Sequence, residues 1–248
     1  MRMQWIDWAL LSAIVMLAGV VRGCIGFGFS ALVVACGVLF LPPATVVPLV
    51  AVLEIVASVQ MAASTWRQIA VKPLVLLLIG TAIATPFGVM ALVLMPADLI
   101  RLLLSAMILL LSLLLLSGWH YKGVVKTWHY VFMGLISGTC NGAAAVGGLP
   151  VATFLASIKL SMPVLRATLV MFFFVADIIF IISASGHSVY SESLIVLSAA
   201  MVLPMLIGIF FGTRLFHKLN EAMLRRGVIG LLLLLSLIGL SKGILSYL

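Results

Sequence analysis

Long apolar runs occupy most of this chain, and short polar or basic segments separate them. The runs lack the alternation of apolar and polar residues that marks barrel strands, so they favour helices. Most of them approach the roughly 20 residues that a helix needs to cross about 30 Å of hydrocarbon. The pattern predicts an all-α polytopic membrane protein with about eight to ten spanning or half-spanning helices. The expected segments are 5–21, 31–41, 44–65, 74–95, 99–117, 127–137, 151–160, 165–185, 191–216 and 223–247.

Two glycine-rich stretches, at 22–30 and 138–150, interrupt the apolar pattern. Inside a bilayer, non-helical backbone survives only where protein buries it or where it lines a wet cavity. The segment after the first break, 31–41, is too short to cross the hydrocarbon at about 1.5 Å per residue. We expect two broken or re-entrant hairpins that enter from opposite faces and meet near the midplane. Such paired breaks point to the binding site of a transporter.

The two breaks belong to an internal repeat. Arg101 and Arg225 lie 124 residues apart, and so do Gly88 and Gly212. Near the breaks the spacing falls to 115 residues, as between Gly23 and Gly138. We expect an N-terminal repeat (1–118), a linker (119–126) and a C-terminal repeat (127–248) within one transmembrane domain.

Basic residues indicate how the two repeats are oriented. Arg67 and Lys72 flank one loop, whereas the equivalent loop of the second repeat, 185–191, carries no Lys or Arg. Equivalent loops therefore lie on opposite faces, which is the signature of an inverted repeat. The predicted cytoplasmic segments are 66–73, 118–127, 159–166 and 214–226, and the outer ones are 41–44, 96–98, 186–191 and both termini.

Composition agrees with a multi-pass membrane protein that contacts the lipid bilayer. Hydrophobic residues make up 65% of the chain and charged residues 8%, against about 25% charged residues in soluble domains. The net charge of +8 does not indicate a nucleic-acid partner, because most basic residues lie in the loops that set topology. No metal-ligand spacing, hydrolase elbow or Walker loop occurs, so we expect no enzymatic activity and no cofactor.

The first break has the residue types that bind an anion. Arg22 is a cation next to an apolar segment that is expected to lie in the membrane. A charge inside the membrane is by default a functional candidate. Gly23, Gly26 and Gly28 would let backbone N–H groups approach a ligand at a helix N-terminus, and Ser30 adds a hydroxyl. The alternative places Arg22 at the cytoplasmic end of a spanning helix, where its side chain snorkels to the interface.

The second break offers similar groups without charge. Asn141 supplies amide donors at a comparable position, and the glycines Gly142, Gly147 and Gly148 surround it. Close packing of helix backbones is the alternative explanation for glycines in membrane helices. We expect these four residues to complete a substrate site with the first break.

Glu54 and Asp177 are the acids that lie deep inside apolar helices, in the third segment of each repeat. Each is a candidate proton carrier or pathway residue, a candidate partner for Arg22, or a counter-charge that repels the wrong ion. The alternative is a neutral, hydrogen-bonded carboxylic acid that braces helix packing. Segment 171–174, with three phenylalanines, is expected to contact lipid or the core.

The chain resembles the TauE/SafE family of sulfite exporters. The resemblance rests on its length, the duplicated core, a Gly-x-x-Gly-x-Gly-Phe break at 23–29 and an Asn-Gly-x-x-x-x-Gly-Gly-x-Pro break at 141–150. It implies an inner-membrane permease for small sulfur-containing anions such as sulfite, thiosulfate or organosulfonates. The family includes both importers and exporters.

Two functions follow from these observations. The leading one is a secondary transporter of a small anion, with protons as one candidate coupling ion and one half rocking against the other. The alternative is a channel-like passive conductor of a small ion, with Glu54 and Asp177 along its path. The sequence leaves the substrate, the direction and the oligomeric state open.

Overall fold

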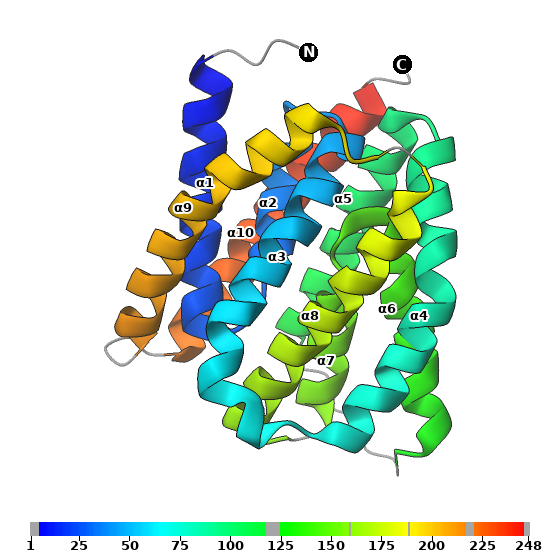
Figure 1. Cartoon of the computed structure of the whole chain (residues 1–248), viewed down its shortest axis with the longest axis vertical. Coiled ribbons are helices and arrows are strands. Elements are labelled where there is room, and N and C mark those ends of the chain that lie inside the picture. Colours follow the sequence, from blue (N-terminus) through cyan, green and yellow to red (C-terminus); the bar gives the residue numbers. More distant parts are fainter. Residues whose placement is uncertain (1–4, 118–124, 159, 188, 217–220, 246–248) are drawn as a thin grey trace.

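The computed structural model of this chain describes residues 5–117, 125–158, 160–187, 189–216 and 221–245. Within these ranges the chain forms ten α-helices, a short 3-10 turn at Trp66–Gln68 and no strand. All ten predicted helical segments are found (Figure 1). The helices are α1 (Trp5–Ile25), α2 (Phe29–Gly37), α3 (Pro43–Thr65), α4 (Val71–Leu94), α5 (Ala97–Leu116), α6 (Thr127–Ala144), α7 (Gly148–Ser157), α8 (Met162–Ser185), α9 (Glu192–Phe216) and α10 (Glu221–Leu245).

Helix length and composition confirm a polytopic membrane protein. In the described part of the chain, six helices are long and apolar enough to cross a membrane: α1, α3, α4, α5, α8 and α9. Large apolar side chains such as Phe87, Leu110 and Leu203 are exposed on the outside of the bundle. A surface of this kind is stable in hydrocarbon and not in water.

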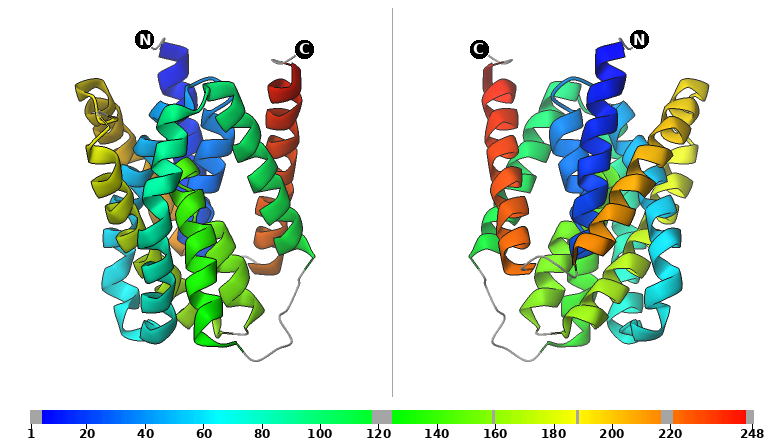
Figure 2. Two further views of the ribbon diagram at one scale, coloured as in Figure 1. Left: turned by 90° about the vertical axis from the view of Figure 1, so that its right-hand side faces the viewer. Right: turned by 90° about the vertical axis from the view of Figure 1, so that its left-hand side faces the viewer.

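The two halves repeat one pattern in opposite directions. Helices α1–α5 and α6–α10 each consist of a longer helix, a short helix and three longer helices. The first residues of α1 and α6 lie at opposite ends of the bundle (Figure 2). The α3–α4 and α8–α9 connections, which are equivalent, also lie at opposite ends (Figure 1). This arrangement is that of an inverted repeat. The predicted linker, 119–126, falls mostly outside the described residues, so its bounds stay a prediction.

Glycines join the two halves through close helix contacts. Helix α1 packs along α9, and α6 packs along α4, so each pair combines one helix from each half. A Cβ atom added at Gly23 would stand 2.5 Å from the carbonyl oxygen of Ile209, and one at Gly142 would stand 2.3 Å from that of Thr85. Only glycine allows the backbones to approach this closely.

Both breaks are shorter than the sequence predicted. Helix α1 continues through Arg22 and Gly23 to Ile25, and α6 continues through Asn141 and Gly142 to Ala144. The glycines in these turns serve helix packing, so their presence does not end the helix. The backbone leaves the helix only at 26–28 and 145–147. Here the chain reverses direction, and the two hairpins enter from opposite ends (Figure 2).

Positive φ angles make the two turns. Gly26 and Gly28 have φ angles of +88° and +91°, and Ala145 has +53°. Residues other than glycine are sterically strained at these φ angles. The strain is smaller for a small residue such as Ala145, in the left-handed helical region, than for a bulky one. The first turn therefore depends on glycine more strictly than the second.

Candidate functional site

An ion pair between Arg22 and Glu54 forms the centre of the first half. Both side chains are 0% exposed, and Nη1 of Arg22 contacts Oε2 of Glu54. Nη2 of Arg22 also donates a hydrogen bond of 2.9 Å to Oγ of Ser58, on the same helix as Glu54. Arg22 lies in the last turn of the spanning helix α1, as that alternative held, but its side chain is buried against Glu54 and Ser58, so the snorkelling part is wrong. The role of Glu54 as a partner for Arg22 is confirmed.

Glu54 also holds the N-terminus of α2. The backbone N–H of Ser30, in the first turn of that helix, donates a hydrogen bond of 3.2 Å to Oε1 of Glu54. Helix N-termini attract anions because their first N–H groups have no partner within the helix. One carboxylate thus satisfies both positive groups that the sequence assigned to an anion: the guanidinium of Arg22 and an amide at the break.

Phe173 extends this site into the second half. The guanidinium carbon of Arg22 lies 4.5 Å from the centre of the Phe173 ring, a cation–π contact. A Cβ at Gly148, the first residue of α7, would stand 2.0 Å from the same ring. The N-terminal turns of both short helices therefore border the Arg22 cluster. Sequence reasoning placed Phe173 in lipid or core, because nothing in segment 171–174 distinguishes a ring that covers a cation.

The second half has a pair at the comparable position, with different chemistry. Nδ2 of Asn141, on α6, donates hydrogen bonds of 3.2 Å to Oδ1 of Asp177 and to the carbonyl oxygen of Ala176, on α8. Asp177 is 1% exposed, and its Oδ2 accepts no hydrogen bond from any described residue. Phe173, whose ring Arg22 covers, lies one helical turn before Asp177 on α8. The charges of Glu54 and Arg22 also act on Asp177, so the two pairs form one cluster.

Arg166 is a cation that the sequence reasoning counted only as part of a loop. Its Nη2 donates a hydrogen bond of 2.9 Å to the carbonyl oxygen of Gly23, at the end of α1. A Cβ at Gly26 would stand 2.7 Å from Cγ of Arg166. Two arginines from different halves therefore flank the first break. Local sequence contains no signal for this contact, since 143 residues separate the partners.

The remaining predicted residues take part in helix contacts and turns. Gly23 and Gly142 face neighbouring helices, as described above, and Gly28 forms the turn before α2. Oγ of Ser137 donates a hydrogen bond of 2.6 Å to the carbonyl oxygen of Gly147, which braces the second turn. Direct contact of these glycines with a ligand stays a prediction.

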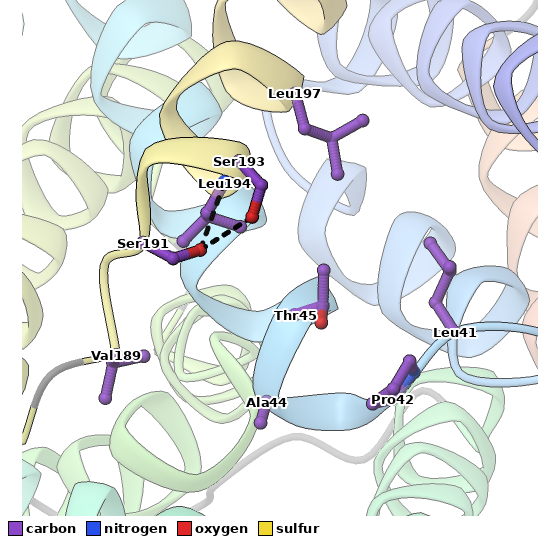
Figure 3. Close-up of a pocket in the computed structure, with 9 residues that line it drawn as sticks. All are labelled: Leu41, Pro42, Ala44, Thr45, Val189, Ser191, Ser193, Leu194 and Leu197. Carbon is purple, nitrogen blue, oxygen red and sulfur yellow. Dashed lines mark hydrogen bonds between the residues drawn. The ribbon is translucent and has the colours of Figure 1, made fainter. Parts of the chain in front are cut away.

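A cavity of about 180 Å³ opens where the α2–α3 and α8–α9 connections meet (Figure 3). Hydroxyls of Thr45, Ser191 and Ser193 point along its wall, among apolar residues (Figure 3). By the predicted topology this is the outer face.

Tyr190 stands between the cavity-lining residues Val189 and Ser191 in the chain. Its hydroxyl is buried and has no hydrogen-bond partner in the described structure. Burial and the nearby Asp177 carboxylate both raise the pKa of this hydroxyl. Tyr190 therefore belongs to the segment that lines the cavity and has its hydroxyl buried near Asp177.

The family model for the sulfite exporter TauE/SafE matches residues 11–238. The chain belongs to the TauE/SafE family. The matched range contains both hairpins and the whole Arg22–Glu54–Asn141–Asp177 cluster. Comparison with curated proteins and with solved structures returned no match. Family membership and the six candidate spans make this chain a multi-pass membrane protein of a family that transports sulfur-containing anions.

Proposed function

We propose that this TauE/SafE member is a secondary transporter that moves sulfite, thiosulfate or a small organosulfonate across the cytoplasmic membrane. The observation that carries the proposal is Arg22, a fully buried cation between helices of both halves. Its Nε donates no hydrogen bond to any described residue. A charged group at this depth is costly, and a site for an anion is a physical reason to retain it.

The groups around Arg22 suit an oxyanion. A guanidinium presents its N–H donors in a planar fork that matches two oxygens on one atom. The first-turn amide of Ser30 adds a donor at the start of α2, directly after the Gly26–Gly28 turn. On the opposite side, Asn141 with Gly142, Gly147 and Gly148 would complete the binding surface from the second hairpin.

Transport requires movement, because Arg22 and Glu54 are closed to solvent. We assign the cavity beside Tyr190 as the outer mouth of the path. The glycine contacts tie α1 to α9 and α4 to α6. These cross-half pairs are therefore better candidates for the moving units than the two sequence halves, since separating either pair would break its closest backbone contacts.

The test is uptake of sulfite and thiosulfate into proteoliposomes that hold the purified protein, with and without a pH gradient. Saturable uptake and counterflow by the wild type, together with less than about one hundredth of that rate for Arg22→Met, would support the carrier and its site. Arg67→Met, a change at an exposed loop cation, is the matched control and should retain uptake.

The channel alternative predicts a different result. A passive conductor shows no counterflow, because its flux does not depend on exchange through a closed binding site. Non-saturable flux without counterflow would therefore reject the carrier. Uptake by Arg22→Met at the wild-type rate would remove Arg22 from the site but leave the family assignment intact.

A further inference from the structure

The buried cluster contains one basic and two acidic side chains: Arg22, Glu54 and Asp177. The nearest polar partner of Asp177 is the neutral amide of Asn141. Burying net charge in a region of low dielectric is costly. The cluster is neutral when one carboxyl holds a proton, and the contacts favour Arg22 and Glu54 as the ionised pair.

Glu54 occupies the position at which an external anion would be most stable. Its Oε2 contacts the guanidinium, and its Oε1 accepts the N–H of Ser30. The two oxygens of one carboxylate thus use both positive groups of the first break. A sulfonate, sulfite or thiosulfate also presents two oxygens on one atom and needs the same donors.

We propose that Glu54 is an internal substitute for the substrate, and that the anion replaces it on Arg22 and on the α2 N-terminus only as Glu54 gains a proton. This inference rests on the proposed function. A hydronium ion of the surrounding solution gives its proton to a carboxylate oxygen of Glu54 and becomes water. The ionic contact between Glu54 and Arg22 is lost, and the anion forms a new ionic contact with Arg22. No covalent bond of the substrate changes.

Charge balance then sets how many protons are taken up for each anion that binds. Replacement of a carboxylate by a monoanion, with uptake of one proton by Glu54, leaves the charge of the cluster unchanged. Binding without the proton would add a negative charge beside Asp177. Each bound monoanion therefore brings one proton, and the site discriminates against anions that cannot bridge two donors.

Few other charges face Glu54 from the surrounding helices. On α8, Nη2 of Arg166 donates its hydrogen bond to the carbonyl oxygen of Gly23. On α5, Asp98 and Arg101 pair with each other. On α9, Glu192 and Arg214 are exposed near its two ends. Arg22 and Asp177 therefore dominate the electrostatics of Glu54, together with the Ser30 amide.

Binding-linked proton uptake tests the inference without requiring transport. Methanesulfonate is the probe, because a sulfonate stays ionised throughout the experiment. Purified protein in weakly buffered detergent is mixed with it between about pH 5 and pH 8, and proton uptake and affinity are recorded. The wild type should take up about one proton per bound anion, and its Kd should rise about tenfold per pH unit once Glu54 is ionised in the free protein.

Glu54→Gln imitates the protonated side chain, so it should bind the anion with a pH-independent Kd and take up no proton. Glu192→Gln, an exposed acid on α9, is the matched control and should behave as the wild type. Asp177→Asn should retain proton uptake.

Anion binding by the wild type without proton uptake would overturn the inference and leave the carrier proposal standing. The same holds if Asp177→Asn, and not Glu54→Gln, abolishes the uptake. Proton-linked binding without any flux in proteoliposomes would instead reject the carrier and support the Glu54 exchange. Absence of methanesulfonate and thiosulfate binding would reject both.

Discussion

The two hairpins occupy equivalent places in the inverted halves, but the first contains a buried ion pair and the second a hydrogen bond from an uncharged amide. At the end of α1, Arg22 forms an ion pair with Glu54 on α3. At the end of α6, the uncharged amide of Asn141 donates a hydrogen bond to Asp177 on α8. Each pair joins the first helix of its half to the third. The difference teaches that a duplicated scaffold can keep its architecture while the pair at the hairpin contains a buried cation in only one half.

The α3–α4 and α8–α9 connections, which are equivalent in the two halves, also differ in the burial of their aromatic residue. Trp66 and Tyr190 lie at equivalent positions, 124 residues apart. Trp66 is 59% exposed beside Arg67, whereas the Tyr190 hydroxyl is buried near Asp177. The second half thus has a buried hydroxyl in this connection, whereas the first half has an exposed indole.

Removal of the charge from the first hairpin should have the largest effect. Arg22→Met leaves the Glu54 carboxylate buried without its cation, and we expect a loss of about 3–5 kcal/mol in the free energy of unfolding. The double variant Arg22→Met/Glu54→Met should recover most of that stability, because no uncompensated charge remains, but should not bind an anion. Denaturant unfolding in micelles and anion binding would measure both. Binding by the double variant would contradict the role of the pair.

The glycine contacts that hold each hairpin should respond alike in both halves. Gly23→Ala and Gly142→Ala place a methyl group against a carbonyl oxygen of the neighbouring helix, so each should cost about 1–3 kcal/mol. Gly230→Ala, where nothing lies within 4 Å, should be neutral or stabilising by up to about 1 kcal/mol. Thermal unfolding of the three variants checks this. Equal stability for all three would show that the close contacts are not formed.

The second hairpin should tolerate the loss of its polar contact better than the first. Asn141→Ala removes hydrogen bonds to Asp177 and to the Ala176 carbonyl, with an expected cost of about 1–2 kcal/mol. Anion affinity should fall less than in Arg22→Met, because no charge is lost. Unfolding and binding measurements on both variants in parallel test the order. A larger effect at Asn141 would reverse the assigned roles of the halves.

Tyr190→Phe should have the smallest effect. The substitution removes a buried hydroxyl that has no hydrogen-bond partner in the described structure, so stability should stay within about 1 kcal/mol of the wild type. Burial and Asp177 raise the pKa of this hydroxyl, so it stays protonated below its ordinary value of about 10. The pH profile of uptake between about pH 6 and pH 9 should therefore be the same in both proteins. A shifted profile would give Tyr190 a part in proton transfer.

Sequence reasoning selected Arg22, Glu54, Asn141 and Asp177 because charged and amide groups stand out in apolar segments. The same reasoning could not find Phe173 or Arg166. A phenylalanine among phenylalanines and an arginine at a helix start carry no distinguishing local signal. Their importance follows from contacts with α1, and those contacts depend on which helices become neighbours.

The sequence alone determined the ten helices, the membrane environment and the position of the two hairpins. Hydropathy, span length and residue identity are local properties. They can be evaluated for each segment without knowing which segments it packs against. Only the tertiary structure decided that Glu54 forms the ion pair with Arg22 and that Gly23 and Gly142 serve helix packing. Those outcomes depend on long-range pairing, α1 with α3 and α9 and α6 with α4, because a polar group or a glycine acquires its role from whatever the fold places against it.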